Sequence, residues 1–174
     1  MRILFSILAS VALANATTLV KMSMDDLIAK STEIVRAKVV GVRTASVGQD
    51  IYTYYQLQVS ESLKGASVPA EVAVSGGVYG NLRQVAVGSP VLNQGQEYVL
   101  FLWTNSHKTS QLIGLAQGML SLSEDASGTL VLSRPAVHDQ MLDASGKPVA
   151  DSAVNMKWSD LKALITRTLG KGKQ

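Results

Sequence analysis

The segment Glu97–Trp103, with the sequence Glu-Tyr-Val-Leu-Phe-Leu-Trp, constrains the fold of this chain more than any other stretch. If the segment is a β-strand, its side chains alternate between two faces, and an unbroken apolar run makes both faces apolar. Both faces then have to be buried. A strand of a β-barrel buries one face inside the barrel, so another element must cover the outer face. Helices near the two ends of the chain are the candidates for that cover.

Two short amphipathic patterns predict these helices. Ser23 is a good N-cap, Asp26 follows three residues later as a loose capping box, and an apolar stripe predicts a helix over Met24–Lys30. Near the other end, Ser159 is expected to cap a second helix and Gly170 to end it. The apolar face of this second helix is formed by Leu161, Leu164, Ile165 and Leu169.

Between the helices, short strand patterns alternate with glycine-rich and polar turns. The clearest is Ile51–Leu63, and Val42–Asp50 before it is interpreted as a connecting loop that contains Gly48. After Pro135, a small hairpin is expected to turn at Ser145-Gly146. Further strands are expected at Ile34–Arg43, Glu71–Val74, Arg83–Val87, Ile113–Ala116, Met119–Ser123 and Thr129–Leu132. The pattern predicts a mainly β fold, a barrel or a small sandwich, with an N-terminal and a C-terminal helix.

Residues 1–16 have the pattern of a secretory signal peptide. Arg2 supplies the positive charge, Ile3–Leu13 is apolar, and Ala14-Asn15-Ala16 is a cleavage pattern. The apolar run is shorter than the roughly 20 residues that span a bilayer. We expect cleavage after Ala16, a periplasmic or secreted protein that begins at Thr17, and no remaining transmembrane segment. A buried N-terminal helix or an uncleaved anchor is the alternative. The expected division is residues 1–16 as signal peptide, 17–133 as barrel domain, and 134–174 as a hairpin and helix packed on the barrel.

Composition excludes several kinds of site. The chain contains no cysteine, which rules out disulfides, thiolate metal sites and cysteine nucleophiles. The formal net charge is +3, and the basic residues at Arg167 and Lys171–Lys173 are interpreted as a solvated tail, with contact to anionic lipid or polysaccharide as the alternative. Nucleic acid is not an expected partner, because no arginine-rich stripe interleaves with aromatic residues.

Three segments together resemble known protein families. They are Ile34–Val42, Tyr52–Gly65 and Leu92–Leu102, and their succession is similar to uncharacterised exported bacterial proteins. More distantly it resembles the netrin-like module of tissue inhibitors of metalloproteinases. The resemblance runs from Ser23 to Leu132 and implies a five-stranded OB-like Greek-key barrel. The inhibitors' N-terminal cysteine, whose backbone chelates the target's zinc, is absent, and Thr17 takes the terminal position. This departure argues against the inhibitors' mode of action.

No recognised motif marks a catalytic, cofactor or metal site, so none is predicted. His107 lies in a polar turn and His138 follows Pro135, and both are interpreted as solvated or locally bonded. Glu124-Asp125 could offer oxygens to calcium but is more typical of a hairpin turn. The Ser159-x-x-Lys162 spacing lacks its partner motifs. The glycines of Gly76–Gly80 are interpreted as a strand-to-strand connection and not as a phosphate loop.

A possible partner-binding face lies on the polar side of the Ile51–Leu63 strand. It consists of Tyr52, Tyr54, Gln56 and Gln58, and aromatic and amide side chains together suit a peptide or a sugar. The alternative is that a flanking helix covers both rings. The sequence therefore predicts an exported, non-enzymatic binding or scaffolding module of the bacterial envelope, with an unknown protein or polysaccharide partner. A protease-inhibitor-like protein and an envelope hydrolase with an unrecognised site remain alternatives.

Overall fold

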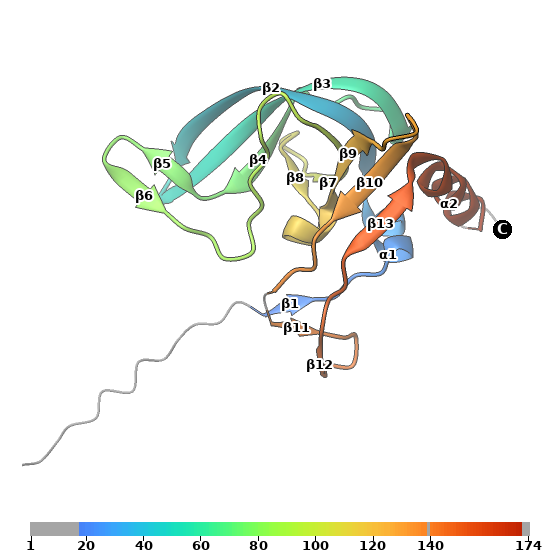
Figure 1. Cartoon of the computed structure of the whole chain (residues 1–174). Helices are drawn as coiled ribbons and strands as arrows, with labels where there is room; N and C mark the ends of the chain where they lie inside the picture. The colour runs from blue at the N-terminus through green and yellow to red at the C-terminus, as the bar shows by residue number, and fades with distance from the viewer. Residues whose placement is uncertain (1–17, 139, 172–174) are drawn as a thin grey trace, which may run out of the picture.

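The computed structural model describes residues 18–138 and 140–171 and is mainly β, with two α-helices (Figure 1). The predicted signal peptide and its cleavage site lie outside these residues. In chain order the elements are β1 (Leu19–Val20), α1 (Met24–Lys30), β2 (Glu33–Val47), β3 (Asp50–Lys64), β4 (Glu71–Ser75), β5 (Gly77–Tyr79), β6 (Leu82–Gln84), β7 (Glu97–Thr104), β8 (Ser110–Leu112), the 3₁₀-helix η1 (Leu115–Gly118), β9 (Met119–Glu124), β10 (Leu130–Arg134), β11 (Met141–Leu142), β12 (Pro148–Val149), β13 (Val154–Lys157) and α2 (Trp158–Lys171).

The main sheet has the strand order β13-β10-β9-β7-β2-β3-β4-β8, and an additional pairing joins β8 to β7. The strands β2, β3, β4, β8 and β7 therefore form a closed circuit of pairings. All of these pairs are antiparallel except β4–β8, which is parallel and consists of the single pair Ala73–Gln111. The second edge of β7 is shared, since Glu97–Leu100 pairs with β9 and Leu102–Thr104 pairs with β8. Strands β9, β10 and β13 thus continue the sheet beyond the circuit.

The alternation of β7 divides the buried residues into two clusters. Tyr98, Leu100 and Leu102 belong to a cluster enclosed by the circuit, together with side chains of β2, β3 and β4. Val99 and Phe101 point the other way, into a cluster with side chains of α1, α2, β9 and β10. The sequence-based expectation that helices cover the second face of this strand is confirmed.

Helix α1 has the bounds predicted from sequence, and both of its ends are capped. The backbone N–H of Asp26 donates to Ser23 Oγ at 3.0 Å, and the Ser23 N–H donates to Asp26 Oδ2 at 3.3 Å, which completes a capping box. At the other end, Lys64 Nζ of β3 donates to the carbonyls of Ile28 and Ala29 at 2.7 and 2.9 Å. A cation is favourable there because the last carbonyls of a helix carry partial negative charge.

Helix α2 differs from its prediction at both ends. It begins at Trp158, directly after β13, so Ser159 lies inside the first turn and is not the cap. The buried Trp158 side chain anchors this first turn in the outer cluster. The helix also continues through Gly170 to Lys171 instead of ending at the glycine.

Two other local predictions are wrong. The loop expected over Val42–Asp50 is a hairpin, because β2 runs to Val47 and only Gly48 and Gln49 turn the chain; Gly48 has φ +63°. The strand expected over Ile113–Ala116 is interrupted by Gly114 and Leu115, which have φ values of 64° and 56°. The strand lies earlier instead, at Ser110–Leu112.

The remaining predicted strands differ from the observed strands mainly in length. β6 is shorter than the expected Arg83–Val87 strand, and β13 was not predicted. The small C-terminal hairpin is confirmed, because β11 pairs with β12 across the turn at Ser145-Gly146. β1 adds to the same small sheet, parallel to β11.

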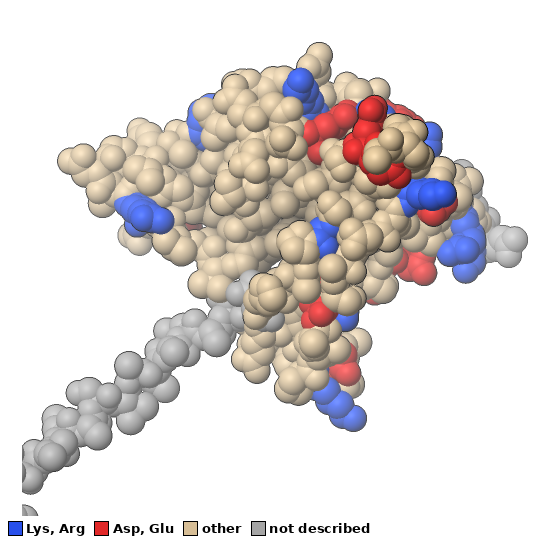
Figure 2. All heavy atoms as spheres, viewed as in Figure 1, with Lys and Arg blue, Asp and Glu red and all other residues tan. Residues whose placement is uncertain are grey.

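Charge is unevenly distributed over the surface. In Figure 2 the acidic and basic side chains gather on the side of β9, β10 and α2, whereas the lobe built by β5 and β6 is nearly uncharged on the face shown. Among the described residues, no helix combines the length and the apolar character needed to span a bilayer.

Candidate functional site

Tyr52 and Tyr54 lie on the outer face of β3, opposite the side chains that fill the interior of the circuit. Their neighbours Ile51 and Tyr55 are buried, whereas the two tyrosines are half-buried. The helices pack near the other end of β3, where Leu63 joins the outer cluster and Lys64 caps α1. Neither helix therefore covers the two tyrosine rings.

The Tyr54 ring is held in place by a cation–π contact. The Arg43 guanidinium lies 4.0 Å from the ring centroid. The same guanidinium donates two hydrogen bonds to Glu71, Nη2 to Oε1 at 2.6 Å and Nε to Oε2 at 3.2 Å. The three side chains come from β2, β3 and β4, which are adjacent in the sheet. The Tyr52 ring lies beside Tyr54, with 6.3 Å between centroids and 49° between planes.

The loop between β7 and β8 faces this aromatic pair. Asn105 Oδ1 accepts hydrogen bonds from the backbone N–H groups of His107 and Thr109, at 2.9 and 3.0 Å. Lys108 has φ 60°, a left-handed conformation that completes the tight turn. The turn is therefore ordered by its own hydrogen bonds, and it presents His107 and Thr109 towards the tyrosines.

Two adjoining hollows separate the aromatic pair from the loop, and we call them together the tyrosine groove. Both are lined by Tyr54, His107 and Thr109, and their volumes are about 310 and 190 Å³. The larger is also lined by Val47, Tyr52, Asn105 and Gln111, and the smaller by Glu71, Ala73, Lys108 and Ser110. The walls thus combine aromatic, amide, hydroxyl and imidazole groups, with a carboxylate that is already paired to Arg43.

The structure brings together only part of the partner-binding face that was predicted on β3. Tyr52 and Tyr54 line the tyrosine groove, whereas Gln56 and Gln58 are exposed further along β3 and do not line it. Gln56 lies over Gly41, where its amide occupies the space that a side chain at residue 41 would need. Sequence reasoning missed Arg43 because it placed this residue at the end of a strand, before a loop. His107 was recognised only as part of a polar turn, because its approach to β3 depends on the sheet order.

The other sequence candidates are not joined into a site. Asp125 Oδ1 accepts hydrogen bonds from the N–H groups of Ser127 and Thr129, which confirms the interpretation as a hairpin turn. Ser159 Oγ donates to its neighbour Asp160, while Lys162 Nζ lies 3.9 Å from Glu61 Oε1. Within residues 18–138 and 140–171, no three histidine, aspartate or glutamate side chains gather closely enough to hold a metal ion.

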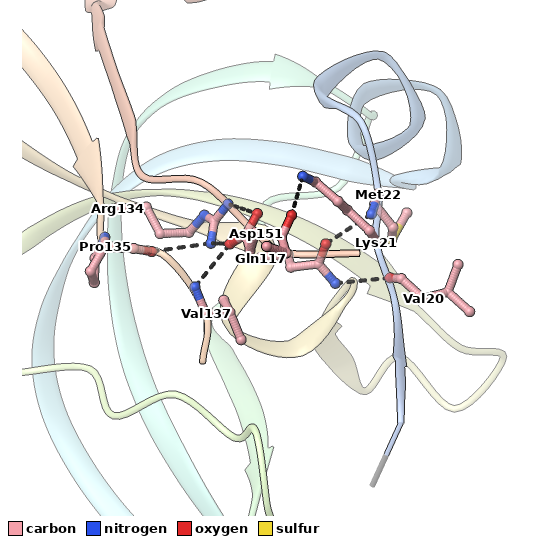
Figure 3. Close-up of polar contacts among 9 residues, drawn as sticks. Val20, Lys21, Met22, Gln117, Arg134, Pro135, Val137 and Asp151 are labelled. Carbon is pink, nitrogen blue, oxygen red and sulfur yellow. Dashed lines mark hydrogen bonds and ion pairs between the residues drawn. The ribbon is translucent and has the colours of Figure 1, made fainter. Parts of the chain in front are cut away.

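A buried ion pair lies outside the tyrosine groove. Arg134 Nη1 donates to Asp151 Oδ2 at 2.6 Å, and the Val137 N–H donates to the same oxygen at 2.9 Å (Figure 3). Burial opposes ionisation of Asp151, but these hydrogen bonds outweigh it and lower its pKa from 3.8 to about 2. The pair therefore links the end of β10 to the segment that leads to β13.

A second set of contacts fixes the N-terminal strand. The Gln117 side chain accepts a hydrogen bond from the Met22 N–H at 2.8 Å and donates to the Val20 carbonyl at 3.0 Å (Figure 3). Lys21 Nζ donates to the Ala150 carbonyl at 2.8 Å. No sequence signal points to these contacts, because the partners are far apart in the chain.

Comparison of the chain with protein-family models, with curated proteins and with solved structures found no match.

Proposed function

We propose that the chain is an exported, non-enzymatic binding module of the bacterial envelope, built on an OB-like Greek-key barrel, and that its tyrosine groove binds an oligosaccharide. The order of strands supports the barrel part of this proposal. β7 lies beside β2, followed by β3 and β4, which is the order 4-1-2-3 of a Greek key. β8 then pairs with both β4 and β7, as closure of a five-stranded barrel requires.

The position of the groove is the observation that carries the proposal. OB-folds bind oligonucleotides and oligosaccharides on the face of strands 2 and 3, between the loops that follow strands 1 and 4. In this chain those elements are β3, β4, the β2–β3 turn and the β7–β8 loop. β3, β4 and the β7–β8 loop supply Tyr54, Ala73 and His107, and Val47 is the last residue of β2 before the turn. All four residues line the tyrosine groove.

The chemistry of the walls favours a sugar over a nucleic acid. An oligonucleotide needs several cations that neutralise its phosphates. Of the basic side chains beside this groove, Arg43 is already paired with Glu71, which leaves Lys108. Aromatic surface with amide, hydroxyl and imidazole groups suits the many hydroxyls and the apolar ring face of a saccharide. The signal-peptide pattern of residues 1–16 supports a location where envelope polysaccharides are available.

The test is binding of the purified protein to an array of bacterial and plant glycans, followed by calorimetry on the best ligand. Replacing both groove tyrosines, Tyr52→Ser with Tyr54→Ser, should weaken binding about 30-fold or more, since buried aromatic contacts typically contribute about 2 kcal/mol or more to an interface. The unfolding free energy should fall by only about 1–2 kcal/mol, the scale of two cross-strand contacts.

Tyr79→Ser is the matched control, because Tyr79 is an exposed tyrosine outside the groove. It should bind glycan as the parent does. An array with no glycan bound by the parent, or equal binding by the double variant, would contradict the proposed function.

A further inference from the structure

The segment between Glu71 and Glu97 has an unusual distribution of charge. Arg83 is its sole charged residue, and it contains no acidic residue at all. This segment folds into β4, the β5–β6 hairpin and the following strap to β7. Val72, Val74 and Leu92 of this segment are buried in the core, and the formal charge of its exposed part comes from one arginine.

Large apolar side chains are exposed on this region. Leu82, Val85 and Val91 are 68%, 73% and 72% exposed, and Val78, Tyr79 and Val87 are exposed as well. We call these six residues the hairpin surface. Val78, Val85 and Val91 also border one open hollow of about 290 Å³, which shows that the strap lies next to the hairpin. Contiguous exposed apolar surface of this kind marks an interaction site.

The hairpin is firmly attached and does not bury this surface itself. Thr44 Oγ1 donates to the Val78 carbonyl at 2.7 Å, and Thr53 Oγ1 donates to the Gly76 carbonyl at 2.8 Å. β5 and β6 pair with each other from Gly77–Gln84 to Tyr79–Leu82, so their facing backbone groups are satisfied. Figure 1 shows the hairpin projecting beyond the ends of β2 and β3, and Figure 2 shows little charge on the visible face of its lobe.

We propose that the hairpin surface docks on a lipid bilayer that contains anionic lipid. The hairpin projects from the main sheet, so it can reach the headgroup region, and the backbone groups that β5 and β6 turn towards each other are already paired there. Tyr79 has the amphipathic character of residues at a membrane interface. Arg83 has no acidic neighbour in its segment and is complementary to a lipid phosphate, and Asp50 contacts the hairpin only at its base, through Gln84.

The proposal is independent of the sugar-binding function, because the hairpin surface and the tyrosine groove share no residue. A protein with both surfaces would lie on a bilayer through the hairpin and bind its ligand through the groove. Each surface can therefore be tested while the other one is kept intact.

The experiment is co-sedimentation of the purified protein with vesicles of phosphatidylcholine and phosphatidylglycerol in equal parts, and with vesicles of phosphatidylcholine alone. The parent should bind the mixed vesicles more strongly, and added salt should weaken that binding. Leu82→Ser with Val85→Ser should reduce partitioning into either vesicle at least about tenfold, because two apolar side chains no longer leave water. Arg83→Gln should remove the preference for the anionic vesicles.

Val40→Ser with Val68→Ser is the matched control, since both valines are exposed elsewhere on the molecule. It should bind vesicles as the parent does, and each double variant should keep the parent's urea midpoint. A Tyr79→Trp variant gives a second readout that needs no loss of binding: its fluorescence emission should shift to shorter wavelength on the mixed vesicles.

Three outcomes would overturn the proposal. One is a parent that stays in the supernatant with both vesicles, and another is equal partitioning of the hairpin and control variants. The third is a concentration-dependent dimer in analytical ultracentrifugation that Leu82→Ser with Val85→Ser abolishes, because a second copy of the chain would then cover the surface. Failure of vesicle binding would leave the glycan experiment unaffected, and the reverse also holds.

Discussion

At the scale of the residue, the carboxylate of Asp151 illustrates how a charge is kept ionised inside this protein. Its side chain is 3% exposed, and the Arg134 side chain that it contacts is 9% exposed. Removing one partner of such a pair leaves the other charge buried and uncompensated. The contacts of Asp151 with both Arg134 and Val137 make it the junction between β10 and the segment that leads to β13.

Asp151→Ala should therefore destabilise the protein by about 3–5 kcal/mol at neutral pH. The pKa of Asp151 in the folded protein is about 2, below its ordinary value of 3.8. Its contribution is therefore present above about pH 4 and is lost as the pH falls towards 2, by about 2 kcal/mol in all. Urea titrations of parent and variant between pH 7 and pH 2 measure this loss of stability.

The difference in stability between parent and Asp151→Ala should narrow in acid. Glu124→Ala, at the exposed end of β9, should stay within about 0.5 kcal/mol of the parent. A difference between parent and Asp151→Ala that does not change with pH would contradict the assignment of the lowered pKa to this pair.

At the scale of the element, the serines at the starts of the two helices can be compared, because one caps its helix and the other does not. Ser23→Ala should lower the unfolding free energy by about 1 kcal/mol, because it removes the side chain that accepts the Asp26 N–H. Ser159→Ala should change it by less than about 0.5 kcal/mol, because Ser159 lies inside α2 and alanine favours a helix. Equal losses in urea titrations would show that Ser159 is a cap after all.

Strand β7 gives a second test at this scale. Phe101 is completely buried in the outer cluster, so Phe101→Ala should cost about 3–5 kcal/mol. Trp103 lies two residues further along the same face and is 47% exposed, so Trp103→Ala should cost about 1 kcal/mol or less. Thermal and urea unfolding of the two variants measure the difference. Similar losses of stability for both variants would mean that the helices also cover Trp103.

Elements with strong periodicity could be predicted from sequence, and elements set by backbone geometry could not. The alternation in Ile51–Leu63 and the apolar run of Glu97–Trp103 specify β3 and β7, because burial of each face follows directly from the pattern. β8 has the sequence Ser-Gln-Leu, which carries no strand signal of its own. Its position depends on its pairing with β4 and β7, and on the left-handed conformations at Gly114 and Leu115 after it.

The candidate site, too, could be predicted only where its residues belong to a strand with a clear sequence pattern. Tyr52 and Tyr54 could be assigned to one face of a strand from sequence alone. The residues opposite them could not be assigned, because His107 and Thr109 reach the tyrosines only through the way β8 joins the sheet. The second half of β2 contains many small and polar residues, a pattern that is typical of a loop. For this reason the sequence did not indicate that Arg43 lies within a strand.

At the scale of the whole molecule, the proposed location outside the cytoplasm can be tested separately from the groove and the hairpin surface. The predicted signal peptide is the part of this proposal that a single measurement can test. N-terminal sequencing of the protein from a cell-envelope fraction should begin at Thr17, because Ala14 and Ala16 are the small residues that a signal peptidase recognises. Recovery of the uncleaved chain from the cytoplasm would contradict both the cleavage and the location.

The parallel pairing of β4 with β8 has a consequence for motion. It consists of the single pair Ala73–Gln111, and these two residues also line the tyrosine groove. We expect the circuit to open first at this seam, so that amide hydrogens near it exchange with solvent sooner than those along β2 and β3. A ligand that contacts both sides of the groove would hold the seam closed and slow this exchange. Part of its binding free energy would then appear as protection of amides that it never touches.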